Sequence, residues 1–169
     1  SSDLARFYTI FASPPTNTLE WSDESVEGSY RFLKRVWAYS LKFQSRTRTE
    51  TSEQLRKATR FEIHSVLRQI NYDMGKHQFN TVASGAMKIL NALERLEGFP
   101  SEAEEGLKIL LRVLSPTTPH IAHHAWRELK FGEDIMQAPW PEPDPAALEQ
   151  DEVELVVQVN GKLRGSIRV

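Results

Sequence analysis

The side chains with the clearest potential for chemistry are three histidines that lie close together in the sequence. His120 and His124 are one helical turn apart, a spacing that lets two imidazoles share a metal ion, and His123 lies between them. No glutamate stands in HExxH spacing, however, and the chain contains no cysteine. We therefore expect no metal site here, with one histidine packing or capping near a helix start at Pro119 and the others facing solvent. A metal-dependent enzyme built on the three histidines remains the alternative.

Other residue sets that support catalysis are missing from the sequence. There is no Gly-rich phosphate loop and no GxSxG motif, and Gly85 is a single glycine that indicates close packing within a helix. The acidic run at 133–154 holds eight carboxylates and no cation, but it is rich in proline and is typical of a solvated linker. We expect no catalytic residue in this chain and no cofactor bound by it.

A cluster of cations is the second chemical feature. The whole chain has a net charge of −2 and an isoelectric point near 6.2, which is not typical of a nucleic-acid-binding protein. Residues 28–49 nevertheless hold six cations and no acidic residue: Arg31, Lys34, Arg35, Lys42, Arg46 and Arg48. The first four recur at helical spacing and so share one face. This asymmetry favours contact with a polar, anionic partner on that face.

The elements that must position these residues are amphipathic helices. Apolar periodicity predicts helices at about 23–46, 52–75, 81–97, 102–114 and 119–130. Before them, a short apolar stretch at 4–12, ended by Pro14-Pro15, is either the tail of a helix that starts upstream or a helix of about two turns. Asn80 or Thr81 is the predicted cap of the 81–97 helix, and Ser101 with Glu104 has the form of a capping box. The expected fold is all-α, an antiparallel bundle of about five helices. The expected apolar stripe of the 23–46 helix is Val26, Tyr30, Leu33, Val36, Trp37 and Leu41.

The end of the chain has a different pattern. Prolines and acidic residues predict an extended linker at 136–152, and alternating apolar residues around Asn160-Gly161 predict a β-hairpin at 153–169. Because a lone hairpin is marginal in water, we expect it to open a second, truncated domain after a helical domain at 1–135. The start at Ser1 without a methionine suggests an excised segment. The lack of cysteine suggests the cytoplasm, and no run is apolar enough to span a membrane.

Several segments together resemble the bacterial leucyl-tRNA synthetases, which are class I aminoacyl-tRNA synthetases. The similarity is carried by the stretch from Ala5 to Pro14, by Leu19-Glu20-Trp21 with RFLKRVW at 31–37, by Phe79-Asn80-Thr81, and by LSPTTPHI at 114–121 with Trp126. It covers essentially the whole chain, including APWP at 138–141 and VQVNGK at 157–162. Ser115 and Thr117 depart from the Asn and Phe that are common in the family.

The resemblance implies a tRNA-binding piece of a larger enzyme. The implied parent attaches leucine to tRNA(Leu) with ATP and Mg, and its catalytic and editing domains lie outside this chain and are partners of the bundle. The bundle would grip the tRNA stem through phosphates, with no DNA or membrane partner. We expect RNA contacts first at Arg31, Lys34, Arg35 and Lys42, then at Arg46, Arg48, Arg68 and Lys76, and also at Lys162 and Arg164 after the hairpin turn.

Each assignment has an alternative at this stage. Arg31 is one turn from Glu27 and can pair with it, and Arg35 can pair with the catalytic domain. Trp37 and Trp126 lie on apolar stripes, which favours core packing over stacking on bases, while Trp21 and Trp140 can pack across a domain junction. The alternative function is a stand-alone helical interaction module whose basic face docks an acidic protein partner.

Overall fold

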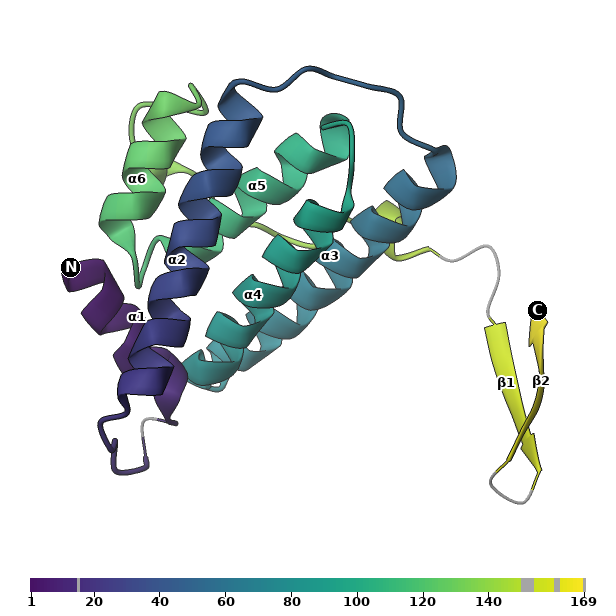
Figure 1. Ribbon diagram of the computed structural model, residues 1–169, viewed down its shortest axis with the longest axis horizontal. Helices are drawn as coiled ribbons and strands as arrows, with labels where there is room; N and C mark the ends of the chain where they lie inside the picture. The colour runs from purple at the N-terminus through teal and green to yellow at the C-terminus, as the bar shows by residue number, and fades with distance from the viewer. Residues whose placement is uncertain (15, 150–153, 160–161, 169) are drawn as a thin grey trace.

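A computed structural model describes residues 1–14 and 16–149, together with the backbone of two strands between 154 and 168 (Figure 1). Its α-helices are α1 (Ser2–Ala12), α2 (Asp23–Gln44), α3 (Glu53–Gly75), α4 (Phe79–Arg95), α5 (Ser101–Leu114) and α6 (Pro119–Glu128). Two 3₁₀ turns follow, η1 (Ile135–Gln137) and η2 (Pro145–Leu148). The strands β1 (Glu154–Val159) and β2 (Lys162–Arg168) pair antiparallel. The predicted Asn160-Gly161 turn lies outside the described residues.

The described part of the bundle has six helices rather than about five, because the stretch at 4–12 forms a complete helix. The hydroxyl of Ser1 accepts from the Leu4 amide and so caps α1. Phe7 and Tyr8 of this helix are almost fully buried, and Phe7 stacks on Phe32 of α2 with 5.1 Å between ring centroids. Helix α1 therefore contributes to the core.

The centre of the core lies where α3, α4 and α5 meet. The side chains of Leu67, Leu90, Leu93, Leu107 and Leu110 have no exposed surface there. Gly85 lets α4 approach α3, since a Cβ atom at this position would lie 2.7 Å from Cγ1 of Ile70. The prediction that Gly85 is a close-packing site is confirmed.

The start signals of two helices were predicted wrongly. Helix α4 begins at Phe79 after Gln78, ahead of the predicted caps Asn80 and Thr81. Helix α5 begins at Ser101 itself, because Pro100, whose backbone is extended, occupies the cap position before it. The Ser101 hydroxyl contacts Glu102 instead of capping, so the predicted capping box is absent.

The predicted apolar stripe of α2 is also wrong in part. The buried face is centred on Phe32, Val36, Tyr39 and Phe43, with Leu33 beside them. Three residues assigned to the core are instead exposed: Tyr30 by 49%, Trp37 by 37% and Leu41 by 48%. The row through Tyr30, Trp37 and Leu41 is only partly covered by other helices, with Trp37 lying against the His124 ring of α6.

The described part of the predicted linker, residues 136–149, lies against the bundle. Trp140 donates to the Asn71 side chain at 2.7 Å, and Arg112 donates to the Pro139 carbonyl at 3.1 Å. Asp144 pairs with Arg60 at 2.5 Å. We call residues 139–148 the strap, because these contacts fasten it across α3 and α5. No helix in the described part of the chain is both long and apolar enough to cross a membrane.

Candidate nucleic-acid interface

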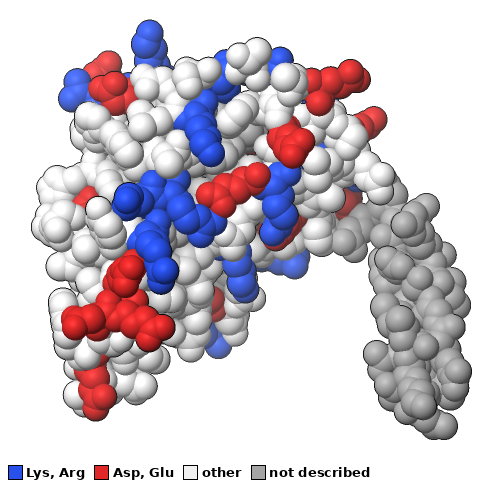
Figure 2. Space-filling view, viewed as in Figure 1, with Lys and Arg blue, Asp and Glu red and all other residues white. Residues whose placement is uncertain are grey.

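Helix α2 presents its cations on the surface of the bundle. Ser22 caps the helix by accepting a hydrogen bond from the Ser25 amide. Asp23 and Glu24 occupy the first turn, where carboxylates interact favourably with the positive end of the helix dipole. Arg31, Lys34 and Lys42 follow on the exposed side. Figure 2 shows blue side chains gathered over the middle of α2 and red ones near its N-terminal end. We call Arg31, Lys34 and Lys42 the basic face.

The ion pairs around this surface separate its cations into two kinds. Arg35 is engaged within the chain, with Nη2 2.5 Å from Glu94 and 2.7 Å from the Asn91 side-chain oxygen. Among the described residues Arg31 and Lys42 form no ion pair, so the alternative pairing of Arg31 with Glu27 is not present. Lys34 lies over the Tyr30 ring, 5.4 Å from its centroid. The available positive charge of α2 is therefore on the basic face.

The other predicted cations are dispersed. Arg46 lies 3.9 Å over the Phe43 ring and donates to the Phe43 carbonyl, and Arg48 is 3.9 Å from Glu104. Arg68 is exposed on α3, and Lys76, which directly follows α3, is exposed and lies over the Tyr72 ring. Lys162 and Arg164 fall in β2. The structure thus does not bring the eight predicted cations between residues 31 and 76 into one patch.

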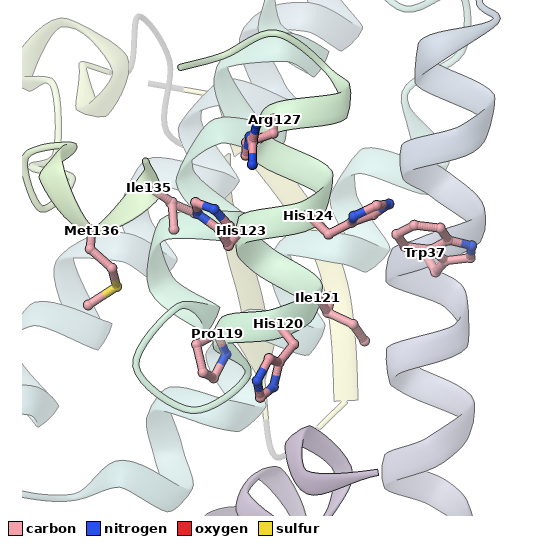
Figure 3. Close-up of a pocket in the computed structure, with 9 residues that line it drawn as sticks. All are labelled: Trp37, Pro119, His120, Ile121, His123, His124, Arg127, Ile135 and Met136. Carbon is pink, nitrogen blue, oxygen red and sulfur yellow. The ribbon is translucent and has the colours of Figure 1, made fainter. Parts of the chain in front are cut away.

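The three histidines of α6 point to three different partners. His120 Nδ1 is 2.8 Å from Asp3, and His123 Nδ1 is 3.7 Å from Asp134. The His124 ring lies against Trp37, with centroids 5.2 Å apart (Figure 3). Within residues 1–14 and 16–149, no three His, Cys, Asp or Glu side chains are grouped so that they could hold a metal ion. This geometry does not support the metal-dependent alternative.

Asp3 organises the start of α6, a role that the sequence analysis missed. Its carboxylate is buried and accepts from the Ile121 amide at 2.8 Å and from Arg6 Nη2 at 2.7 Å. Since α6 has no capping side chain of its own, Asp3 caps it from another helix. Burial alone would raise the pKa of Asp3, but the hydrogen bonds from Ile121, His120 and Arg6 outweigh it and lower that pKa. No local pattern signals a cap supplied from 118 residues away.

A second polar network, also missed, holds the strap. The buried His64 ring accepts from the Asp144 amide through Nδ1 at 2.9 Å and contacts Glu105 through Nε2. Because Nδ1 accepts, the proton of the neutral ring is on Nε2 and is donated to Glu105. The hydrogen bond from His64, opposed by burial and assisted by Arg60, lowers the pKa of Glu105. These contacts join α3, α5 and the strap into one rigid support for the bundle.

A helical bundle with exposed cations gathered on one helix has the kind of basic patch that nucleic-acid-binding domains use to contact phosphates. Residues 57–169 match the family model described as the anticodon-binding domain of tRNA ligase, and the chain belongs to this family. Leucine–tRNA ligases are its curated relatives. Those of Aromatoleum aromaticum and Coxiella burnetii are 54% and 49% identical over 99% of this chain, which covers 21% and 22% of their lengths.

A solved structure has the same fold. It is the ternary complex of an Agrobacterium radiobacter LeuRS with tRNA and LeuAMS, matched with a TM-score of 0.79 and 21% sequence identity. The match covers 99% of this chain and 23% of that one. The chain thus spans about a fifth of the length of the relatives it matches. The comparisons support the family predicted from the sequence and not the alternative of an adaptor for acidic proteins.

Proposed function

We propose that this chain is the tRNA-binding and tRNA-positioning part of a leucine–tRNA ligase. The observation that carries the proposal is the basic face of α2, on a bundle that belongs to the anticodon-binding family and is about half identical to leucine–tRNA ligases. Unpaired lysine and arginine side chains attract a phosphate backbone and release its counterions. The bundle therefore supplies affinity and orientation, and the parent enzyme supplies the chemistry.

The contribution to catalysis is geometric. The parent joins leucine to tRNA(Leu) in the cytoplasm with ATP and Mg, in domains other than this one. Anchoring the tRNA body makes delivery of the acceptor end to activated leucine effectively intramolecular, which removes much of the entropic barrier. A rigid anchor is required, and the buried α3–α4–α5 core with its fastened strap is suited to that role.

We rank the predicted RNA contacts by their freedom to bind phosphate. Arg31, Lys34 and Lys42 come first because they are exposed and form no ion pair among the described residues. Arg68 of α3 and Lys76, at the end of that helix, come next. Arg35, Arg46 and Arg48 come last, because the guanidinium of each already contacts a carboxylate or carbonyl oxygen of the bundle.

We also propose a division of the chain into a helical tRNA-binding domain at about 1–135, a connection at 136–152, and the opening hairpin of a further domain at 153–169. The antiparallel pairing of β1 with β2 supports the last part. In that domain Lys162 and Arg164 would contact the tRNA away from the acceptor end.

Charge reversal on the basic face tests the proposal. In the full-length ligase, Arg31→Glu, Lys34→Glu and Lys42→Glu together are expected to weaken tRNA(Leu) binding at least about tenfold at low salt. The slope of log affinity against log salt should fall by about 0.7–0.9 for each phosphate that the variant no longer neutralises. Adenylate formation, measured by pyrophosphate exchange without tRNA, should stay unchanged.

A matched single pair controls for net charge. Lys34→Glu and Lys88→Glu change the charge equally, but Lys88 lies on α4 beside the hollow between α3 and α4. Only Lys34→Glu should reduce tRNA affinity. Equal effects of the two substitutions, or an unaltered affinity of the triple variant, would reject the basic face as the RNA contact.

A further inference from the structure

A broad depression lies over the exposed side of α6. It has a volume of about 700 Å³, and its lining comes from α2 through Trp37, from α6 itself, and from Ile135 and Met136 of η1. Figure 3 shows Trp37 and His124 facing each other on one side, Ile135 and Met136 on the opposite side, and Arg127 farther along α6. Helix α6 thus forms the floor of the depression, Trp37 and His124 form an aromatic wall, and Ile135 and Met136 form an aliphatic wall.

The chemistry of the depression suits one nucleotide. Trp37 offers an exposed indole, and the His124 ring is tilted by 30° beside it. Arg127 is exposed and forms no ion pair among the described residues. A nucleotide combines a base, which has two π faces, with an anionic phosphate. Proteins bind unstacked bases by stacking them on aromatic rings, with a cation nearby.

The position of the depression connects it to the basic face. Trp37 is one turn after Lys34 on α2, and both line an apolar groove that continues past Tyr30 and Leu41. The residues that line the depression include no carboxylate. Glu128 and Glu133 line a neighbouring hollow on the far side of Arg127 from Trp37. An RNA backbone on the basic face therefore reaches the depression without crossing an unpaired anion of its lining.

We propose that this depression binds a single unstacked base of the bound RNA, with Trp37 as its stacking surface and Arg127 as its phosphate contact. The inference rests on the proposed function, since it requires RNA on the basic face. It adds a contact that depends on stacking rather than on charge. It also gives Trp37 a binding role in place of the core role expected from the sequence.

Substitution of Trp37 in the full-length ligase tests the inference. Trp37→Leu should weaken tRNA(Leu) binding about tenfold, because it removes the aromatic face on which the base stacks. The salt slope should stay that of the unmodified enzyme, since stacking releases no counterions. Trp37→Phe, which keeps an aromatic face, should recover most of the affinity. His124→Leu provides a second variant on the same wall, with a smaller loss expected.

Trp21→Leu is the matched control. Trp21 is 72% exposed but lies at the acidic start of α2, where its indole donates to Asp23. This substitution should leave tRNA affinity unchanged. Melting temperatures and pyrophosphate exchange without tRNA are measured for every variant, and neither should change by much.

The outcomes separate the two proposals. If reversal of the basic face weakens tRNA binding but Trp37→Leu does not, the base site is wrong and the proposed function stands. If Trp37→Leu lowers the melting temperature and pyrophosphate exchange without tRNA, the depression is a contact with another domain and the base site is also wrong. If the basic-face variants bind tRNA normally, the proposed function is wrong, and the base site, which depends on it, is rejected with it.

Discussion

Removal of the Asp3 carboxylate should loosen α6, and the size of the effect follows from its contacts. Asp3→Ala leaves the Ile121 amide without its acceptor and removes the side chain that caps α6. Loss of a cap costs about 1 kcal/mol, and an unsatisfied buried donor costs about 1–3 kcal/mol. Arg6 and His120 are 41% and 73% exposed, so water replaces their bonds and they add little. We expect a loss of about 2 kcal/mol.

Guanidinium unfolding followed by circular dichroism measures this loss. For a chain of this length about 2 kcal/mol corresponds to roughly 4–8 °C in melting temperature. Asp3→Asn keeps one acceptor oxygen for Ile121 and should lose only about half as much. Hydrogen exchange should quicken in α6 before it quickens in α4. A loss below about 0.5 kcal/mol for Asp3→Ala, or uniform quickening across the bundle, would refute the capping role.

Three further predictions concern the support of the bundle. Gly85→Ala should destabilise by about 1–3 kcal/mol in chemical denaturation because its Cβ would meet Ile70 at 2.7 Å. Gly28→Ala, at a helical position with open space, should instead stabilise by about 0.5–1 kcal/mol. Arg60→Met removes the bonds to Glu105 and Asp144, so limited proteolysis should cut the strap sooner while the α4 core stays protected. The pKa values of Asp3, Glu102 and Glu105 are lowered in the folded state from their ordinary values of 3.8 for Asp and 4.5 for Glu. These three carboxylates therefore stabilise the folded state when the pH is above those ordinary values. That stabilisation should be lost as the pH falls below about 4.5, so the denaturation midpoint should fall with it. In Glu105→Gln the midpoint should depend less steeply on pH. A midpoint independent of pH in the unmodified protein would contradict the polar networks.

The local patterns of the sequence were sufficient for the helices and for the family. Apolar periodicity placed the five long helices within a few residues of their observed bounds, because each helix must bury one side wherever it packs. The clustering of Arg31, Lys34 and Lys42 on one face also followed from helical spacing alone. These are properties of one segment, and they need no knowledge of neighbours.

The identity of the buried row on α2 was decided only by tertiary structure. Two apolar rows were available, one through Phe32 and Val36 and one through Tyr30 and Trp37, and periodicity does not rank them. Packing of α1 and α4 against α2 selected the first row. Trp37 was left at the surface beside α6, where the depression lies.

Long-range polar contacts could not be predicted from the sequence either, because they depend on which helices pack together. Asp3 reads as an ordinary first-turn carboxylate, and Asp144 reads as a solvated charge in a proline-rich stretch. Their partners, Ile121 and Arg60, are 118 and 84 residues away. Local sequence thus determined which faces are apolar or cationic. The fold alone decided which faces meet, because that choice depends on how all six helices bury their surfaces together.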